Sequence, residues 1–230
     1  MKAEILRWLE RVDLARRQRE ADPELQRKAH EVKRYQQRRF EWTYRDLLAS
    51  PRYREAAGFF LVDLYGPVDF RQRDEEFARI VPKIAALFPA EIISTVLDLA
   101  HLHALSEELD SAMATQLTHE PIGPAEYMRI WLEVGRRQDR EAQLAMVMEI
   151  GKALDRYTRR AWLVKVLQLM RGPARAAGLS SLQHFLERGM TSFRSMRGAD
   201  EFLAIIDSRE SELMRAIFAG DPTAQSELPT

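Results

Sequence analysis

The sequence predicts an all-α fold, a multi-helix bundle in which layered or orthogonal helices surround one central buried helix. Apolar residues recur at helical spacing, as at Ile5, Leu9 and Val12. Helix start and stop signals are frequent, and no segment keeps the apolar–polar alternation that is typical of a strand. Because an amphipathic helix must bury its apolar stripe against another element, a succession of such helices predicts a bundle.

The first two predicted helices are amphipathic and form an N-terminal unit, residues 1–49. Residues 2–20 carry an apolar stripe with arginine and glutamate between its members. Asp22-Pro23 ends this helix and starts the next, which continues to about residue 49. Arginines dominate most faces of the second helix, so we expect it to be long, polar and partly projecting.

The central helix is expected at residues 51–65, because both of its ends are well marked. Ser50 can cap the start, and Pro51 supplies a preset φ where a missing N–H costs nothing. Gly66-Pro67 closes the far end. Between residues 56 and 65 only Asp63 is charged, and this pattern is typical of a helix enclosed by its neighbours.

Five residues of this helix are expected in the structural core. They are Phe59, Phe60, Asp63, Leu64 and Tyr65. A carboxylate on an otherwise apolar helix needs a hydrogen-bonding partner, because a buried unpaired charge is costly. We expect an arginine or a backbone donor to fill this role for Asp63, and Arg71 and Arg73, just beyond the turn, are nearby candidates.

The same segment carries a family resemblance. FFLVDLY, residues 59–65, resembles the signature of the FFLEELY-motif family of uncharacterised bacterial proteins. Phe59, Phe60, Leu61, Leu64 and Tyr65 match that signature, Asp63 replaces a glutamate, and Val62 departs from it. The resemblance implies a bacterial, intracellular, helical protein. It assigns no activity and therefore no functional residues.

Residues 50–220 are expected to form the helical core domain. After a cap at Asp69, a helix runs until Pro82 bends or breaks it, and a second central helix spans about 89–117. The loop 118–124 holds two prolines and a glycine and is the clearest internal boundary. Further helices are expected at about 125–136, 139–154, 157–171, 180–195 and 200–219, followed by a disordered tail at 221–230.

Composition excludes several classes of function. The 230 residues contain no cysteine, which excludes disulfides, thiolate metal sites and thiol nucleophiles and favours the cytoplasm. No uncharged run approaches the roughly 18 residues of a membrane span, so we expect no membrane insertion. Because 35 basic residues balance 35 acidic ones, nucleic-acid binding is not expected either.

Charge is nevertheless unevenly distributed along the chain. Residues 27–45 hold seven basic and two acidic residues, whereas residues 89–126 hold seven acidic residues and no lysine or arginine. Such opposed blocks can pair within the chain or between subunits, and high salt would weaken that pairing. The alternative is that both blocks are solvated helix faces, which contribute little to stability.

The histidines and carboxylates give no strong sign of catalysis or metal binding. His101 and His103 point about 200° apart on a regular helix, so they cannot share one metal ion. We expect His101 to face inward and His103 to lie near the surface. Glu107 and Glu108 fit a solvated face, and phosphate-loop, dinucleotide, serine-hydrolase and zinc-protease motifs are absent. We therefore assign no catalytic residue, metal or cofactor.

The sequence favours a non-enzymatic, cytoplasmic protein–protein interaction module that self-associates through its N-terminal helices. Aromatic and arginine side chains on helices too polar to be central are typical of interface cores. The expected interaction residues are Trp8, Tyr35, Arg38, Arg39 and Trp42. The alternative is a bundle of globin-like or haem-oxygenase-like outline that binds an apolar or tetrapyrrole ligand beside His101. An enclosed apolar cavity would favour the alternative.

Overall fold

A computed structural model describes residues 1–64, 66 and 70–230, and all of its regular structure is helical. The all-α prediction is therefore confirmed for the described residues. The α-helices are α1 (Lys2–Glu20), α2 (Pro23–Thr43), α3 (Arg45–Ala49), α4 (Arg54–Phe59), α5 (Arg71–Leu87), α6 (Ala90–Gln116), α7 (Pro124–Val134), α8 (Arg137–Thr158), α9 (Ala161–Leu169), α10 (Arg171–Ala176), α11 (Ser180–Ser195) and α12 (Asp200–Phe218). A π-helix, η1 (Phe60–Leu64), and a 3-10 helix, η2 (Pro222–Glu227), complete the fold.

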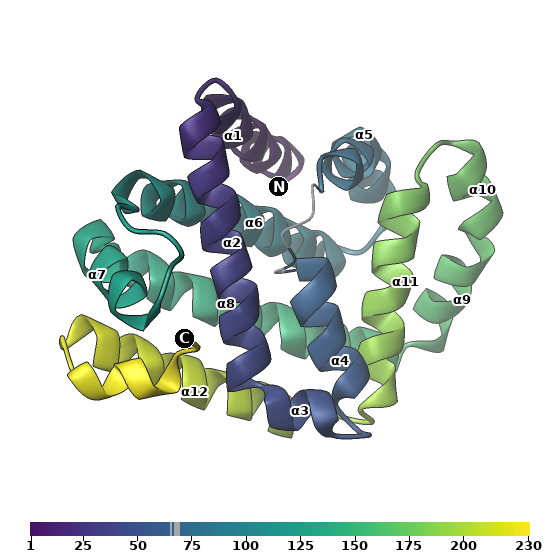
Figure 1. Ribbon diagram of the computed structural model, residues 1–230. Helices are drawn as coiled ribbons and strands as arrows, with labels where there is room; N and C mark the ends of the chain where they lie inside the picture. The colour runs from purple at the N-terminus through teal and green to yellow at the C-terminus, as the bar shows by residue number, and fades with distance from the viewer. Residues whose placement is uncertain (65, 67–69) are drawn as a thin grey trace.

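The helices cross in layers. Figure 1 shows α2, α4 and α11 running side by side across α6 and α8, with α1 and α5 above them. Helix α6 packs against α1, α2 and α8 and is therefore the central support of the fold. Helices α9 and α10 form a hairpin at one edge of the molecule, and η2 lies at the opposite edge.

Local signals place the first helix boundaries correctly. Helix α1 ends at Glu20, and α2 begins at Pro23 after Asp22, whose side chain accepts hydrogen bonds from the N–H groups of Glu24 and Leu25. Helix α2 stops at Thr43, earlier than expected, and the short α3 continues to Ala49. The break lies beside Tyr44, whose backbone leaves the helical region at φ −112° and ψ 22°.

The central segment begins later than the sequence predicts. Residues 51–53 form turns, and α4 starts at Arg54, whose N–H donates to the Ser50 carbonyl at 2.9 Å. From Phe60 the chain winds as a π-helix, a rare form that often marks functional sites. Phe59 and Phe60 are buried, as expected. The core assignment of Tyr65 and the cap at Asp69 lie outside the described residues.

Three hydrophobic clusters form the core, and the N-terminal helices contribute to all of them. Ile5 and Leu9 belong to the cluster under α1, Val32 and Tyr35 to the cluster near α7 and α12, and Phe40 to the cluster around α4. Residues 1–49 are therefore packed into the same core as the rest of the chain. The structure provides no division between an N-terminal unit and a core domain.

Pro82 and Pro173 do not end the helices that contain them. Pro82 lies on the exposed side of α5, and the helix continues past it to Leu87. Pro173 lies in the first turn of α10, a position that tolerates proline, so a helix forms where a turn was expected.

The expected disordered tail is also wrong for most of its length. The Asp221 side chain caps η2 by accepting from the Thr223 N–H at 2.9 Å, and Leu228 is buried in the core. Tyr35 donates its hydroxyl hydrogen bond to the carbonyl of Pro229 at 3.0 Å. Packing of Leu228 and these two hydrogen bonds order a segment that has too few apolar residues to fold by itself.

Candidate functional site

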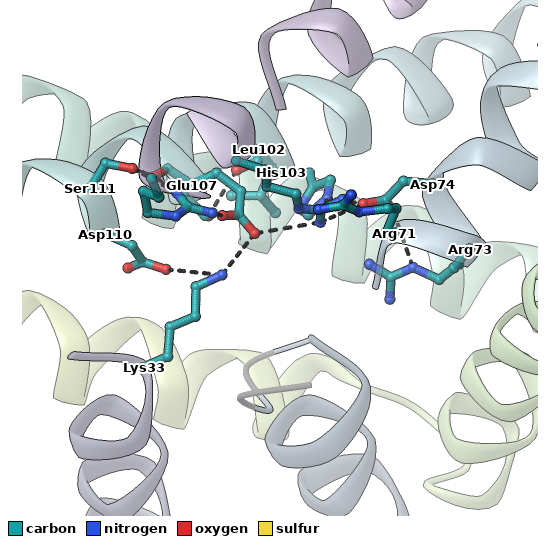
Figure 2. Close-up of polar contacts among 12 residues, drawn as sticks. Lys33, Arg71, Arg73, Asp74, Leu102, His103, Glu107, Asp110 and Ser111 are labelled. Carbon is teal, nitrogen blue, oxygen red and sulfur yellow. Dashed lines mark hydrogen bonds and ion pairs between the residues drawn. The ribbon is translucent and has the colours of Figure 1, made fainter. Parts of the chain in front are cut away.

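A buried network of charged side chains lies where α1, α2, α5 and α6 meet (Figure 2). Its members come from segments that are far apart in the sequence. They are Arg16 and Arg19 from α1, Lys33 from α2, Asp74 from α5, and His103, Glu107 and Asp110 from α6. Because buried charges are costly unless they are paired, each contact in this network bears on stability.

Glu107 holds the α1–α2 side of the network. Its Oε2 accepts from Arg19 Nη2 at 2.5 Å, and its Oε1 accepts from Lys33 Nζ at 2.8 Å. Arg19 also donates to Ser111 Oγ at 2.6 Å. Burial alone would raise the pKa of Glu107, but the charges of Lys33 and Arg19 hold that pKa well below its usual range. The prediction of a solvated Glu107 is therefore wrong.

Asp74 holds the α5 side. Its Oδ2 lies 2.6 Å from Arg16 Nη2 and 2.8 Å from His103 Nε2. Burial alone would raise the pKa of Asp74, but the hydrogen bond and charge of His103, with the charges of Arg73 and Arg16, lower the pKa to about 2. The network is thus anchored by two carboxylates that remain ionised at neutral pH.

Both α6 histidines are half-buried, so His101 faces inward as expected and His103 lies deeper than expected. His103 points into the network, as Figure 2 shows, while His101 stacks on the Trp8 ring with the ring centroids 4.0 Å apart. Burial lowers the pKa of His101. The two side chains do point apart, as the helical geometry requires.

The opposed charge blocks meet within the chain. Lys33 pairs with Glu107, and Arg27 pairs with Glu120. Gln36 adds a hydrogen bond of 3.0 Å to Asp110, whose pKa is raised by burial. The N-terminal basic block therefore fastens α2 to α6, which leaves less of it for a partner.

Chemically, the network is a set of buried charges that are paired within the chain. Each anchoring carboxylate is already paired with cations, and neither of the two best-formed cavities among the described residues is lined by Glu107 or Asp74. In the described part of the chain, no group of three or more histidines and carboxylates is placed to hold a metal ion. The network's effect is to join the N-terminal helices to the fold.

The structure divides the expected interaction residues into buried and exposed ones. Tyr35 lies fully inside the core, Arg39 is buried and pairs with Glu210, and Trp8 is half-buried against His101. These three are held by their own chain and do not form a free surface. Arg38 is partly exposed, with its guanidinium over the Tyr35 ring, and Trp42 is exposed.

Trp42 borders the larger of the two cavities, a groove of about 520 Å³ between the end of α2, α3, α12 and η2. We name it the Trp42 groove. Its lining includes Trp42, Arg45, Glu212, Leu213, Ala216 and Glu227. The guanidinium of Arg45 lies 4.7 Å from the centroid of the Trp42 ring. The groove thus combines an aromatic wall with charged rims.

Asp63 borders the smaller cavity, of about 230 Å³, together with Arg73 and His184. Its carboxylate Oδ2 lies 2.9 Å from Arg188 Nη2, and Arg73 donates instead to the backbone carbonyl of Asp63 at 2.9 Å. The partner of the Asp63 carboxylate is thus an arginine, as expected, but it is Arg188 on α11 rather than Arg71 or Arg73. Burial raises the pKa of Asp63.

A second exposed surface, which the sequence does not predict, lies on α9. This helix is almost wholly apolar, AWLVKVLQL, yet none of its residues is buried. Trp162, Lys165 and Leu169 share its outer face at i, i+3 and i+7; the Trp162 side chain is 46% exposed and that of Leu169 is 76% exposed. With the adjoining exposed Met170, these residues form what we name the α9 surface.

A signal for this surface is present in the sequence. Residues 156–186 contain six lysines and arginines and no aspartate or glutamate. A helix that is apolar all round is expected to be buried. The sequence predicts a helix at about 157–171 without assigning it a face, and the exposure follows from the place of α9 in the hairpin at the edge of the molecule (Figure 1).

Comparison with known proteins gives one match. The profile of a family described as a domain of unknown function, DUF8198, matches residues 15–224. The chain belongs to this family. No curated protein and no solved structure matches it. Among the described residues of the DUF8198 chain, no helix combines the length and apolarity needed to cross a membrane.

Proposed function

We propose that the DUF8198 chain is a non-enzymatic protein–protein interaction module and that the α9 surface is its docking site. The observation that supports this proposal most directly is a nine-residue, mostly apolar helix with no buried residue, on which Trp162 and Leu169 remain exposed. Tryptophan and methionine are enriched at interface cores, and tryptophan is typical of interface hot spots. This chemistry fits a partner that offers apolar side chains beside acidic ones.

The position of α9 supports the proposal. Helix α9 packs along α8, α10 and α11 at the edge of the bundle, and its outer face is open to a partner (Figure 1). Docking there leaves the three hydrophobic clusters intact. Arg159 and Arg171 at its two ends are paired with Asp155 and Glu187, so Lys165 supplies the charge at the centre of the surface.

The ligand-binding alternative has less support. A tetrapyrrole beside His101 would have to displace Trp8, which stacks on the histidine ring at 4.0 Å. Neither the Trp42 groove nor the cavity at Asp63 is lined by His101. We therefore retain the interaction module as the proposal.

The setting that we propose is the bacterial cytoplasm. The chain has no cysteine, so it does not depend on an environment in which disulfides form. Residues 59–65 resemble the FFLEELY-motif proteins of bacteria. The FFLEELY resemblance assigns no role, so the proposal rests on α9 alone.

The test is a paired substitution. Trp162→Ser with Leu169→Ser removes the apolar part of the α9 surface, while Leu14→Ser, at a side chain that is 55% exposed on α1, serves as the matched control. Affinity capture after crosslinking in cells that express the chain should give protein partners with the wild type and the control, and none with the double variant. Equal capture by all three proteins would contradict the proposal.

A further inference from the structure

We infer that the partner of the α9 surface is the Trp42 groove of a second copy of this chain, so that the protein associates head to tail. This inference rests on the proposed function, because it names the occupant of the same surface. Three observations carry it: opposite charge, complementary shape and position at opposite edges of the molecule.

The first observation is charge. Residues 156–186, which include α9 and α10, carry six basic residues and no acidic one. Residues 200–227, which form α12 and η2, carry seven acidic and two basic residues. Of these, Arg209, Glu212 and Glu227 line the groove beside Arg45 and Asp46, and Arg209 pairs with Asp46. Surfaces of opposite sign steer association and fix its orientation. The two segments are therefore suited to each other.

The charged side chains that could pair across the contact lie on the two surfaces themselves. Glu212 and Glu227 line the Trp42 groove, are exposed, and form no salt bridge within residues 1–64, 66 and 70–230. Lys165 and Arg175 on the α9–α10 hairpin are likewise exposed, without a salt bridge in that part of the chain. Docking would give the lysine an acidic partner. Arg45 at the groove rim is held over the Trp42 ring.

The second observation is shape. The groove holds about 520 Å³, and Leu213 and Ala224 at its lining are buried parts of the core. Trp42 forms an exposed aromatic wall beside them. An aromatic anchor that enters such a pocket is the usual centre of an interface, and stacked or edge-to-face rings add stability. Trp162 has the size and exposure to be that anchor.

The third observation is position. The α9–α10 hairpin lies at one edge of the molecule, and η2 with the C-terminal part of α12 lies at the opposite edge (Figure 1). The α9 surface therefore cannot reach the groove of its own chain. A contact between two different surfaces is heterologous, and repetition of it gives a ring or an open chain of subunits.

The test uses two complementary variants of the full chain. Variant A carries Trp162→Ser and Leu169→Ser and keeps its groove; variant B carries Glu212→Arg and Glu227→Arg and keeps its α9 surface. Light scattering after size exclusion should give a wild-type mass that rises with protein concentration and falls at about 1 M salt, where the Debye length is about 3 Å. Each variant alone should be monomeric.

The decisive sample is an equimolar mixture of the two variants. Only one productive contact is possible, between the groove of A and the α9 surface of B, so the mass should stop at that of a dimer. Circular dichroism checks that each variant is folded, and the single substitution Glu212→Arg, at an exposed side chain of the groove, replaces variant B if the latter is not. A monomeric mixture, or oligomers of A or B alone, would overturn the inference.

Failure of the inference and failure of the proposed function are distinguishable. If the wild type is monomeric at every concentration while the double α9 variant still loses capture of a different protein, self-association is rejected and the interaction module stands. If the α9 variant captures every partner of the wild type and also oligomerises like it, both are rejected.

Discussion

Phe60 lies where aromatic rings from four helices meet. Its ring centroid is 5.6 Å from that of Phe202, 6.3 Å from that of Phe193 and 6.4 Å from that of Phe40. Offset and edge-to-face pairs of this kind add about 0.5–1.5 kcal/mol each beyond the burial of the rings. This one residue therefore joins α2, η1, α11 and α12.

Phe60→Ala should lower the free energy of unfolding by about 3–5 kcal/mol, because the substitution loses transfer energy and leaves a cavity that four helices cannot easily fill. Val62→Ala, two residues on and 45% exposed, is the control and should change the free energy by less than about 0.5 kcal/mol. Urea unfolding followed by circular dichroism measures both. Equal midpoints for the two variants would contradict the central position of Phe60.

The lowered pKa of Asp74 predicts that the stability of the fold depends on pH. Its pKa is lowered from 3.8 to about 2 in the folded chain, so the ionised form stabilises the fold above pH 4 and this contribution, about 2 kcal/mol, is lost as pH falls from about 4 to 2. Asp74→Asn should therefore destabilise the protein at pH 7 and flatten the decline in that window. The exposed Asp13→Asn is the control. An unchanged pH profile in Asp74→Asn would refute this assignment.

At the scale of elements, α11 approaches α4 closely at a glycine. A Cβ built on Gly189 would lie 3.0 Å from Phe59 Cζ, and the Phe59 ring is itself held against Phe60 and Phe185. Gly58, on α4, is different: a Cβ there would meet no described atom within 4 Å. The two glycines therefore have opposite roles in the same helix pair.

Gly58→Ala should stabilise the protein by about 0.5–1 kcal/mol, because alanine loses less backbone entropy than glycine in a helix. Gly189→Val should destabilise it by about 1–3 kcal/mol through overpacking against Phe59. Thermal unfolding of both variants is the measurement. A stabilised Gly189→Val would mean that α11 can move away from α4, contrary to the packing described.

Sequence reasoning recovered the elements better than their contacts. Helix ends at Asp22 and around residues 118–124 depend on local chemistry, which the sequence displays directly. The pairing of Glu107 with Arg19 depends on how α1 crosses α6, and the partner of Asp63 depends on the unusual turn of η1. Local composition predicts neither the angle at which two helices cross nor the change from α-helical to π-helical winding. Exposure of α9 was missed for the same reason.

At the scale of the whole molecule, the N-terminal helices are part of the fold. Helix α1 packs on α6 and α5, and α2 packs on α6 and η1. Removal of both would expose apolar surface in three clusters and leave Glu107 buried without Arg19 and Lys33. Breaking a buried ion pair in this way costs about 3–5 kcal/mol by itself.

Deletion of residues 1–49 should therefore abolish cooperative unfolding, because the broken ion pair and the exposed surface of three clusters act together against a stability of roughly 5–15 kcal/mol for a typical domain. Far-ultraviolet circular dichroism during heating measures this. A truncated chain that keeps its helix content and melts in one sharp transition would contradict this. It would show that residues 1–49 are a separate unit and would favour the interaction surface that the sequence predicts there.

The central claim is that contact with a partner occurs at α9. A photo-crosslinking amino acid placed at Trp162 in living cells tests it most directly, with the same amino acid at Leu14 as the control. The account predicts discrete protein adducts at position 162 and none at position 14. Adducts at position 14 alone, or at neither position, would contradict it.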